Sequence, residues 1–312
     1  MSNYGSGFGI PVLFVEGETI AEAYEKALVT LYQSGMRFKT QYDKDTDPQS
    51  IDSTMNITIH NPLLDPMIHK AFPGGIADLR EYVMELQGVK DHWVKCLDDE
   101  ADKRWEYTYH GRFKKYGLMK TTSGDQSMFR PDISDCVDQI ESVIQKLCEQ
   151  PFTRQAQMIT WIPSLDLTCF DPPCLQSMWY RISEDTDPQS ETFGTYFLNC
   201  NVRIRSNDAW GANFMNMFGL TMFNNDVIAA EIRRRTGRKV VLDRLNWQAD
   251  SYHIYGKDIQ QAKDRLFSKI DNGQSFQTRI LNFWDESIQE MYHEATQEVL
   301  DKIQRHDLDH QK

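Results

Sequence analysis

The sequence predicts an α/β protein (α/β or α+β) in which helices and strands share one large core. Its 312 residues are 40% hydrophobic and 12% aromatic, which is enough to fill such a core and argues against global disorder. Apolar residues recur at helical spacing in some segments, whereas bulky or alternating residues typical of strands fill others. The length allows one large domain or two medium ones.

Helices are predicted from their apolar stripes and from the residues that bound them. The first opens at Gly17-Glu-Thr19, carries Leu28 and Leu31 on its apolar face, and ends at Gly35. Further helices are expected at 76–86, 132–149, 213–235, 258–270 and 274–303.

Strands are predicted where β-forming residues cluster between turn signals. Residues 55–60 alternate and stop at Asn61-Pro62, and residues 176–183 contain the bulky Trp179 and Tyr180. Other strands are expected at 157–162, 195–204, 239–250 and 252–255. The sequence contains no internal repeats.

The charge balance bears on the class of partner. The formal net charge is −12, and the longest basic run is Arg233-Arg234-Arg235. We therefore expect no nucleic acid polymer as a partner, because binding a phosphate backbone needs an extended basic surface. A small phosphorylated ligand remains compatible, since a few arginines in one cleft can hold it.

Six cysteines show neither a Cys-x-x-Cys pair nor the histidine spacing typical of zinc, so no metal site is predicted. There is no signal peptide and no apolar run long enough to cross a membrane. We therefore expect a cytoplasmic protein with free thiols and no membrane partner.

The stretch Asp171-Pro-Pro-Cys174 presents a cysteine at the entrance of a predicted strand. Pro172 and Pro173 each fix one φ angle and keep the residue before them extended. A thiolate held in this way is a candidate nucleophile once local positive charge lowers its pKa. The alternative interpretation is that Cys174 is an inert buried thiol.

Two later motifs favour the nucleophile. Arg205-Ser206-Asn207-Asp208 is followed by Asn216, eight residues past the aspartate, and His253-Ile-Tyr255 comes after it. In this order, the three motifs resemble the thymidylate synthase family over roughly residues 17–258. The resemblance implies a large mixed β-sheet flanked by helices and a homodimer with shared active sites. It divides the chain into a catalytic domain at 1–258 and a helical extension at 259–312, packed on the same domain.

The resemblance also implies catalytic roles. Cys174 would add to carbon 6 of a pyrimidine, and Asp208 would hold the pterin of the folate. Glu81 lies seven residues before Gly88, as in the family's helix whose glutamate reaches the base through water; otherwise it is an exposed helix residue. Tyr109 would line the base pocket, with Tyr107 as the next candidate; otherwise this segment is an aromatic core strand.

The nucleotide would be held by a second group of residues. Arg205 and Ser206 would bind the phosphate, and Asn216 would read uracil. His253 and Tyr255 would bind the sugar 3′-hydroxyl. Arg154 matches one of two family arginines that reach the partner subunit's phosphate, whereas Gln155 replaces the other. Arg37 could close over the phosphate or be an ordinary surface charge.

The implied reaction transfers a one-carbon unit from 5,10-methylenetetrahydrofolate to carbon 5 of a pyrimidine nucleoside monophosphate, with dUMP preferred. Leu175 stands where the family has histidine, and the sequence lacks the usual small apolar carboxyl-terminal lid. Both departures favour a 5-hydroxymethyl product over methylation, because water would reach the exocyclic methylene. The alternatives are a cytidylate hydroxymethylase and a catalytically silent nucleotide-binding relative.

Overall fold

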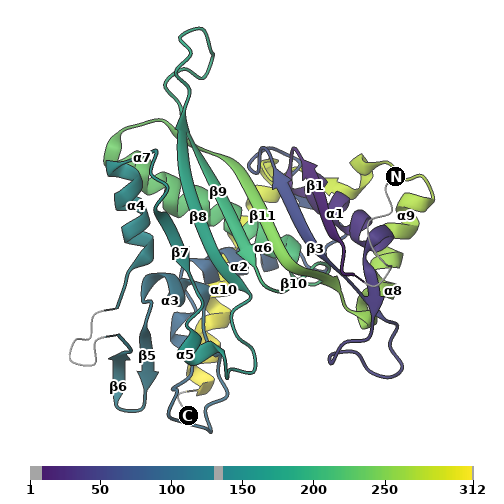
Figure 1. Cartoon of the computed structure of the whole chain (residues 1–312), viewed down its shortest axis with the longest axis horizontal. Coiled ribbons are helices and arrows are strands. Elements are labelled where there is room, and N and C mark those ends of the chain that lie inside the picture. Colours follow the sequence, from purple (N-terminus) through teal and green to yellow (C-terminus); the bar gives the residue numbers. More distant parts are fainter. Residues whose placement is uncertain (1–8, 130–135, 311–312) are drawn as a thin grey trace. The chain divides into compact units, whose positions relative to one another are not determined.

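A computed structural model describes residues 9–129 and 136–310 (Figure 1). The chain divides into two compact units, and each is built from separate stretches of sequence. Unit 1 comprises Met1–Gly75, Asn201–Phe218 and Asp243–Gln289. Unit 2 comprises Ile76–Cys200, Gly219–Leu242 and Glu290–Lys312.

The strands form a large mixed sheet, which confirms the predicted fold class. Its order is β1-β3-β11-β9-β8-β7, and β2 and β10 pair with β3 and β11. Pairing is parallel for β1 with β3 and antiparallel for β3 with β11 and for β7 with β8. The bounds are β1 Val12–Gly17, β2 Met36–Phe38, β3 Ser50–Ile59, β7 Ala156–Ile159, β8 Leu175–Glu184, β9 Tyr196–Ile204, β10 Asn207–Asp208 and β11 Val240–Ile254.

In unit 1, helix α1 covers the paired strands β1 and β3. α1 spans Ile20–Ser34, and the Thr19 hydroxyl caps it by accepting a hydrogen bond from the Glu22 amide at 3.3 Å. Its buried face holds the predicted Leu28 and Leu31. The other short elements of this unit are β4 Ile68–His69, α8 Ile259–Ala262, α9 Ser268–Asp271 and β12 Ile280–Leu281.

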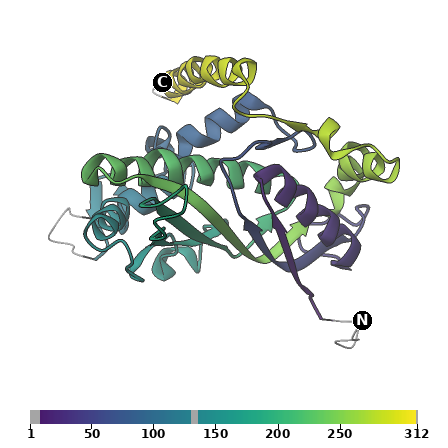
Figure 2. The ribbon, with the colours of Figure 1, turned by 90° about the horizontal axis from the view of Figure 1, so that it is seen from above.

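Unit 2 contains most of the helices. They are α2 Ile76–Leu86, α3 Tyr109–Lys114, α4 Gln139–Glu149, α5 Pro163–Asp166, α7 Ala230–Thr236 and most of α10 Glu286–His310. A short hairpin is formed by β5 Leu118–Thr121 and β6 Gly124–Ser127. Figure 2 shows α10 running along α2, and Arg80 of α2 donates a hydrogen bond to the Thr296 hydroxyl of α10 at 2.8 Å.

The helix predicted at 213–235 is interrupted. α6 covers Asn213–Phe223, a π-helical stretch follows at Asn224–Ala229, and α7 continues to Thr236. Gly237 then ends the helix with φ +68°, a left-handed conformation that favours glycine.

Two other predictions of element bounds were wrong. The helix predicted at 132–149 begins at Gln139, because the Asp138 carboxylate caps it by accepting from the Glu141 amide at 2.9 Å; residues 130–135 lie outside the described part of the chain. The strands predicted at 239–250 and 252–255 are one strand, β11, with a bulge between Ala249 and Tyr252. The alternative interpretation of residues 105–112 as an aromatic core strand was also wrong, because this segment enters helix α3 at Tyr109.

The last predicted helix, at 274–303, begins twelve residues later, at Glu286. Residues 280–281 pair with β4 instead. The Asp65 carboxylate accepts hydrogen bonds from the Phe283 and Trp284 amides at 2.6 and 3.0 Å. These partners, which are distant in the sequence, hold residues 280–284 in a non-helical conformation. The apolar spacing of this segment is helical, but the tertiary contacts prevent a helix from forming there.

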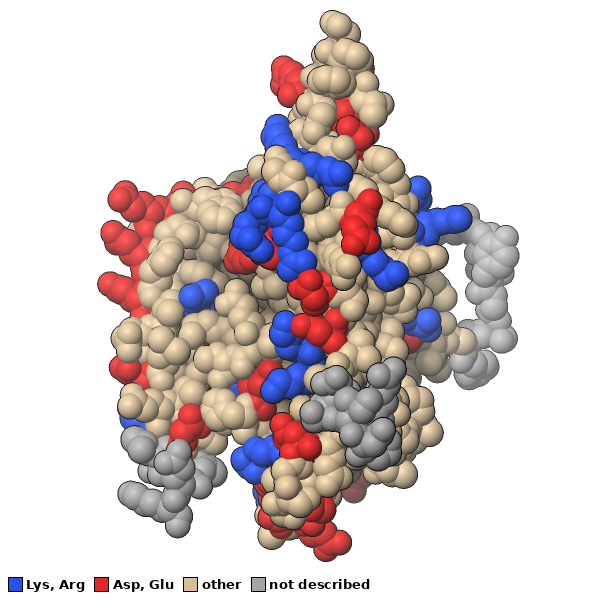
Figure 3. Space-filling view, turned by 90° about the vertical axis from the view of Figure 1, so that its left-hand side faces the viewer, with Lys and Arg blue, Asp and Glu red and all other residues tan. Residues whose placement is uncertain are grey.

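Charged side chains on the face shown in Figure 3 are mixed in sign. Lys and Arg lie among Asp and Glu there instead of forming a continuous basic surface. Ion pairs also join neighbouring helices: Arg235 of α7 pairs with Glu231 and with Glu141 of α4, each at 2.6 Å. Among the described residues, no helix combines the length and apolar composition needed to span a bilayer.

Candidate active site

Cys174 is half-buried in unit 2, directly before β8. The next residue anchors it from two sides: the Leu175 amide donates to the Tyr109 hydroxyl at 3.2 Å, and the Leu175 carbonyl accepts from the Thr160 hydroxyl. The Leu175 side chain is only 1% exposed, so it belongs to the core. Helix α3 and the end of β7 therefore hold the backbone that presents the thiol.

Two tyrosines from the segment before and at α3 lie next to the thiol. The Tyr107 and Tyr109 ring centroids are 5.6 Å apart. Burial raises the pKa of Tyr107, and the nearby Tyr109 and Cys174 groups raise it further. The sequence proposed Tyr109 first, but the structure brings Tyr107 to Cys174 as well.

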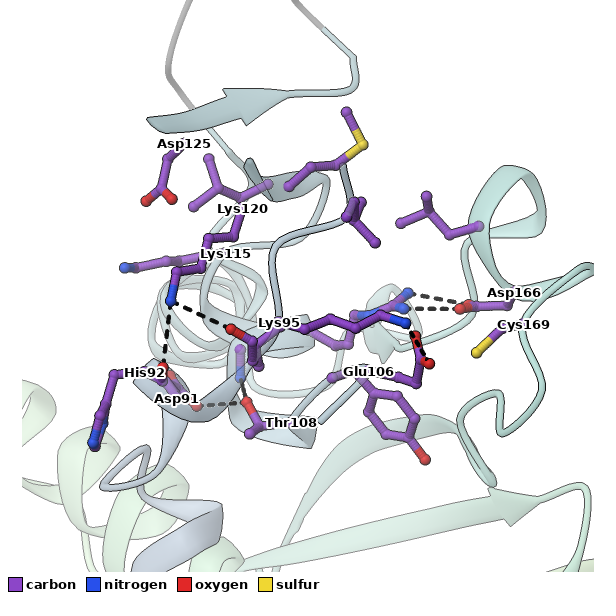
Figure 4. A pocket seen from close by; sticks show the side chains of 18 of the residues that line it. Asp91, His92, Lys95, Glu106, Thr108, Lys115, Lys120, Asp125, Asp166 and Cys169 are labelled. Carbon is purple, nitrogen blue, oxygen red and sulfur yellow. Dashed lines mark hydrogen bonds and ion pairs between the residues drawn. The ribbon is translucent and has the colours of Figure 1, made fainter. Parts of the chain in front are cut away.

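A cavity of about 600 Å³ opens in unit 2 beside Tyr107 (Figure 4). Its lining contains two ion pairs: Lys95 binds Glu106 at 2.6 Å, and Arg112 binds the buried Asp166 at 2.8 and 3.1 Å. Apolar side chains complete the wall; they are Val94, Leu97, Leu118, Met119 and Leu165. The cavity therefore combines apolar surface with charged side chains, and Tyr107 lies on its wall.

Cys169 also lines this cavity, but its chemistry differs from that of an activated thiol. Burial raises the pKa of Cys169 above the ordinary value for cysteine. A thiol with a raised pKa holds its proton at neutral pH and attacks poorly. Cys169 is therefore a suitable comparison residue for Cys174.

Glu81 lies on α2 between two lysines. Lys90, only 4% exposed, contacts Glu81 at 2.7 Å, and Lys302 of α10 contacts it at 2.8 Å. Burial acts to raise the pKa of Glu81, but hydrogen bonds from Lys302 and Lys90 outweigh it and leave the pKa below its usual value. Glu85, which also contacts Lys90 at 3.2 Å, has a raised pKa because burial dominates there. Sequence reasoning missed both lysines.

The second group of predicted residues lies in unit 1, around the end of β9. Arg205 and Ser206 form the turn after β9, and the Arg205 carbonyl accepts from the Ser251 amide of β11 at 3.1 Å. β10 then pairs in parallel with β11, so that Asp208 lies opposite His253. The Arg-Ser-Asn-Asp and His-Ile-Tyr motifs are thus brought together by strand pairing.

Asn216, in the first turns of α6, is oriented by a neighbour that sequence reasoning missed. The Asn207 amide nitrogen is 3.5 Å from the Asn216 side-chain oxygen, and the Asn207 oxygen accepts from the Trp247 indole at 3.0 Å. The indole can only donate, so it determines which end of Asn207 faces Asn216. The signal was available, because Asn207 lies inside the Arg-Ser-Asn-Asp motif.

Asp208 has one engaged and one available carboxylate oxygen. Its Oδ1 accepts from the Trp210 and Gly211 amides at 3.1 and 2.8 Å, whereas Oδ2 bonds to no residue in the described part of the chain. Burial raises the pKa of Asp208, although the two amides act in the opposite direction. A Cβ at Gly211 would lie 2.4 Å from Oδ2, so the glycine keeps this oxygen accessible. This arrangement fits a ligand that presents ring N–H groups, as a pterin does.

His253 has one satisfied and one unsatisfied ring nitrogen. Its Nδ1 lies 3.0 Å from the Ser251 hydroxyl, which donates to Asp52 Oδ2 at 2.8 Å. Its Nε2 is buried and has no hydrogen-bond partner among the described residues. Tyr255 packs edge-on against the His253 ring at 4.7 Å between centroids. Sequence reasoning missed Ser251 and Asp52; no pattern marked Asp52, which lies in an alternating strand.

The two remaining arginines lie at the surface. Arg37, on β2 of unit 1, donates to the Tyr32 carbonyl at 3.1 Å and lies over the Tyr32 ring. Arg154, before β7 of unit 2, is exposed, and its carbonyl accepts from the Trp179 indole at 3.0 Å. Within the described ranges, no group of three or more His, Cys, Asp or Glu side chains could hold a metal ion.

Comparisons with known proteins agree with these motifs. The family model for thymidylate synthase matches residues 77–304. This match omits residues 17–76, which the motif resemblance included, and takes in residues 259–304, which it did not.

Individual relatives point the same way. A protein of Methanococcoides burtonii named "Putative thymidylate synthase" is 34% identical over 189 residues, which are 58% of this chain and 76% of that protein. One of the same name from Methanosarcina barkeri is 24% identical over 80% of this chain and 93% of its own length.

Among solved structures, the thermostable thymidylate synthase A from Bacillus subtilis aligns with a TM-score of 0.52 at 16% identity, over 80% of this chain and 84% of that one, which supports the fold. The chain therefore belongs to the thymidylate synthase family, a family of one-carbon transferases.

Proposed function

We propose that this protein transfers a one-carbon unit to carbon 5 of a pyrimidine nucleoside monophosphate, with dUMP as the preferred substrate. One observation carries the proposal: Cys174 is held at the entrance of β8 by contacts of its neighbour with Tyr109 and Thr160. Carbon 5 of uracil is a poor nucleophile until a thiolate adds to carbon 6, which converts the ring into an enolate. Cys174 is the group that would make this bond.

The unit 1 residues would bind the nucleotide. Arg205 offers a planar fork that matches two phosphate oxygens, and Ser206 adds a hydroxyl donor. The amide of Asn216 both donates and accepts, which suits the carbon 4 oxygen and the ring N–H of uracil. His253 and Tyr255 would meet the sugar 3′-hydroxyl. The buried Nε2 of His253, which has no hydrogen-bond partner within residues 9–129 and 136–310, supports this assignment.

The proposed co-substrate is 5,10-methylenetetrahydrofolate, which supplies the carbon at the oxidation level of formaldehyde. Asp208 would hold the pterin through Oδ2, the oxygen that Gly211 leaves accessible. Glu81 would act on the base through water, as a carboxylate whose charge Lys90 and Lys302 maintain.

Between the two products, we favour 5-hydroxymethyl-dUMP over dTMP. Residues 286–307 form a helix docked on α2 and on Trp93, whose indole donates to Asp307 at 2.8 Å, so this segment is engaged in packing. Leu175 places a buried apolar side chain where a polar one would order water. Water that reaches the exocyclic methylene adds a hydroxyl there.

The decisive experiment incubates the protein with dUMP or dCMP and methylenetetrahydrofolate in ¹⁸O-labelled water. Mass spectrometry then separates the outcomes: hydroxymethylation incorporates one labelled oxygen, methylation incorporates none, and turnover of dCMP instead of dUMP identifies the cytidylate alternative. Absence of any product from either nucleotide would favour the silent nucleotide-binding relative.

Replacement of the nucleophile tests the covalent step. Cys174→Ser should lower turnover by roughly 10³-fold or more while dUMP affinity persists, because only bond formation is lost. Cys169→Ser is the matched control and should keep activity near wild type, since burial already suppresses that thiol. Equal activity of the two variants would remove Cys174 from the mechanism.

A further inference from the structure

Asp52, Ser251 and His253 form a hydrogen-bonded chain in unit 1. β3 and β11 are antiparallel, and Asp52 lies directly opposite His253. Ser251 is two residues before His253 on β11, at the bulge. The Ser251 hydroxyl is 2.8 Å from Asp52 Oδ2 and 3.0 Å from His253 Nδ1. One hydroxyl therefore bridges a carboxylate and an imidazole.

The available protons determine the direction of this chain. The Ser251 hydroxyl donates its single proton to Asp52 Oδ2. Burial raises the pKa of Asp52, although the Ser251 hydrogen bond and the nearby His253 act in the opposite direction. The Ser251 oxygen must then accept from His253 Nδ1–H. A neutral imidazole carries only one N–H, so Nε2 is left as a bare acceptor. Burial lowers the pKa of His253, although the nearby Asp52 and Asp43 act in the opposite direction, which is consistent with a neutral ring.

This acceptor is buried without a partner. His253 is 8% exposed, and neither its Nε2 nor Asp52 Oδ1 has a hydrogen bond within the described part of the chain. An unsatisfied buried acceptor is costly, so the site is complete only when a donor reaches it. Because the ring offers a lone pair, the missing partner is an O–H or N–H donor, which a bound ligand can supply.

We propose that Asp52 and Ser251 are positioning residues that hold His253 as the Nδ1–H tautomer, so that Nε2 accepts a hydrogen bond from a ligand hydroxyl. The identity of that hydroxyl rests on the proposed function: it is the sugar 3′-hydroxyl of the nucleotide. The consequence is a ligand preference, since a 3′-deoxy nucleotide leaves Nε2 unsatisfied and binds more weakly.

The tautomer can be observed directly by NMR of the full chain labelled with ¹⁵N-histidine, with His253→Gln used to assign the ring. The wild type should show a protonated Nδ1 and an unprotonated Nε2. Ser251→Ala should abolish that pattern, and Ser251→Thr, which keeps a hydroxyl, should restore it. Thr58→Val is the matched control on β3, because it removes only a hydrogen bond to Asn246 at 3.3 Å.

Binding supplies the second measurement. Calorimetry should show that the wild type binds dUMP about tenfold more tightly than its 3′-deoxy analogue, and that Ser251→Ala loses most of this ratio while Thr58→Val keeps it. A protonated Nε2 in the wild type, or an unchanged tautomer in Ser251→Ala, overturns the proposal. If neither nucleotide binds, the proposed function fails, and the ring spectra still decide the tautomer.

Discussion

In the proposed function, the amide of Asn216 reads the base, and neighbouring side chains orient that amide. Trp247 donates to Asn207, and Asn207 in turn faces the Asn216 oxygen. An amide presents a donor and an acceptor, whereas a carboxylate presents acceptors or, once protonated, a different pattern. A single substitution should therefore change recognition without moving the backbone.

We expect Asn216→Asp to shift preference from dUMP towards dCMP, because a mismatched buried polar pair is costly. The ratio of kcat/KM for the two nucleotides should change by about tenfold or more. Asn201→Asp is the control in the same unit, on β9, where the side-chain oxygen accepts from Arg244. A wild-type ratio in Asn216→Asp would show that another residue reads the base.

At the scale of secondary structure, α10 contributes charge as well as packing. Val299 and Ile303 of α10 join Met84 and Trp93 in a buried apolar cluster of unit 2. From this docked position Lys302 reaches Glu81 on α2. The electrostatics of a predicted catalytic residue thus depend on a helix more than 200 positions away in the sequence.

We expect Lys302→Gln to raise the pKa of Glu81, because one of its two cationic partners is lost. In the wild type, the pKa of Glu81 is lower in the folded state than in the unfolded state. The ion pair therefore stabilises the protein at pH values above the unfolded-state pKa, and this stabilisation is lost as pH falls through the folded-state pKa. Lys302 is 59% exposed, which limits the effect at neutral pH to about 0.5 kcal/mol.

The measurement is the unfolding free energy of both proteins as a function of pH, together with NMR titration of Glu81. Arg305→Gln is the control, since Arg305 contacts only the Asp301 carbonyl of its own helix among the described residues. The deficit of Lys302→Gln should be largest near neutral pH and should shrink in acid. A deficit that grows in acid would contradict this role for Lys302.

At the scale of the whole molecule, we propose a homodimer in which Arg154 serves the partner's site. Arg154 is exposed and its side chain bonds to no described residue. In an isologous dimer, each site would then borrow this arginine from the other subunit. Because Gln155 stands where the family has a second arginine, each subunit would contribute a single cation to its partner's phosphate.

Mixing Cys174→Ala protein with Arg154→Ala protein should restore activity if each is inactive alone. Random pairing makes half of the dimers hybrid, and each hybrid carries one site free of both lesions, so recovery should reach about a quarter of the wild-type rate. Subunit exchange is verified by native mass spectrometry. If the subunits exchange but activity does not recover, Arg154 serves the site of its own subunit or has a structural role.

Several features followed from the sequence because neighbouring residues determine them. The boundaries of α2 were predicted correctly from an apolar stripe, and Gly88, two residues past the helix, adopts φ +94°, which favours glycine. The fold class and the family were also predicted correctly, the family because three motifs occur in order. The roles assigned to the individual site residues remain predictions.

Other features depended on segments that meet only in the folded chain. The Asp65 carboxylate delays the start of α10 by binding amides more than 200 residues away. Ser251 likewise gains its role from Asp52 across paired strands. Local sequence encodes helix periodicity and turn chemistry, because these depend on near neighbours. The partners of a buried carboxylate, histidine or lysine are chosen by strand register and helix docking, so only the tertiary structure decided them.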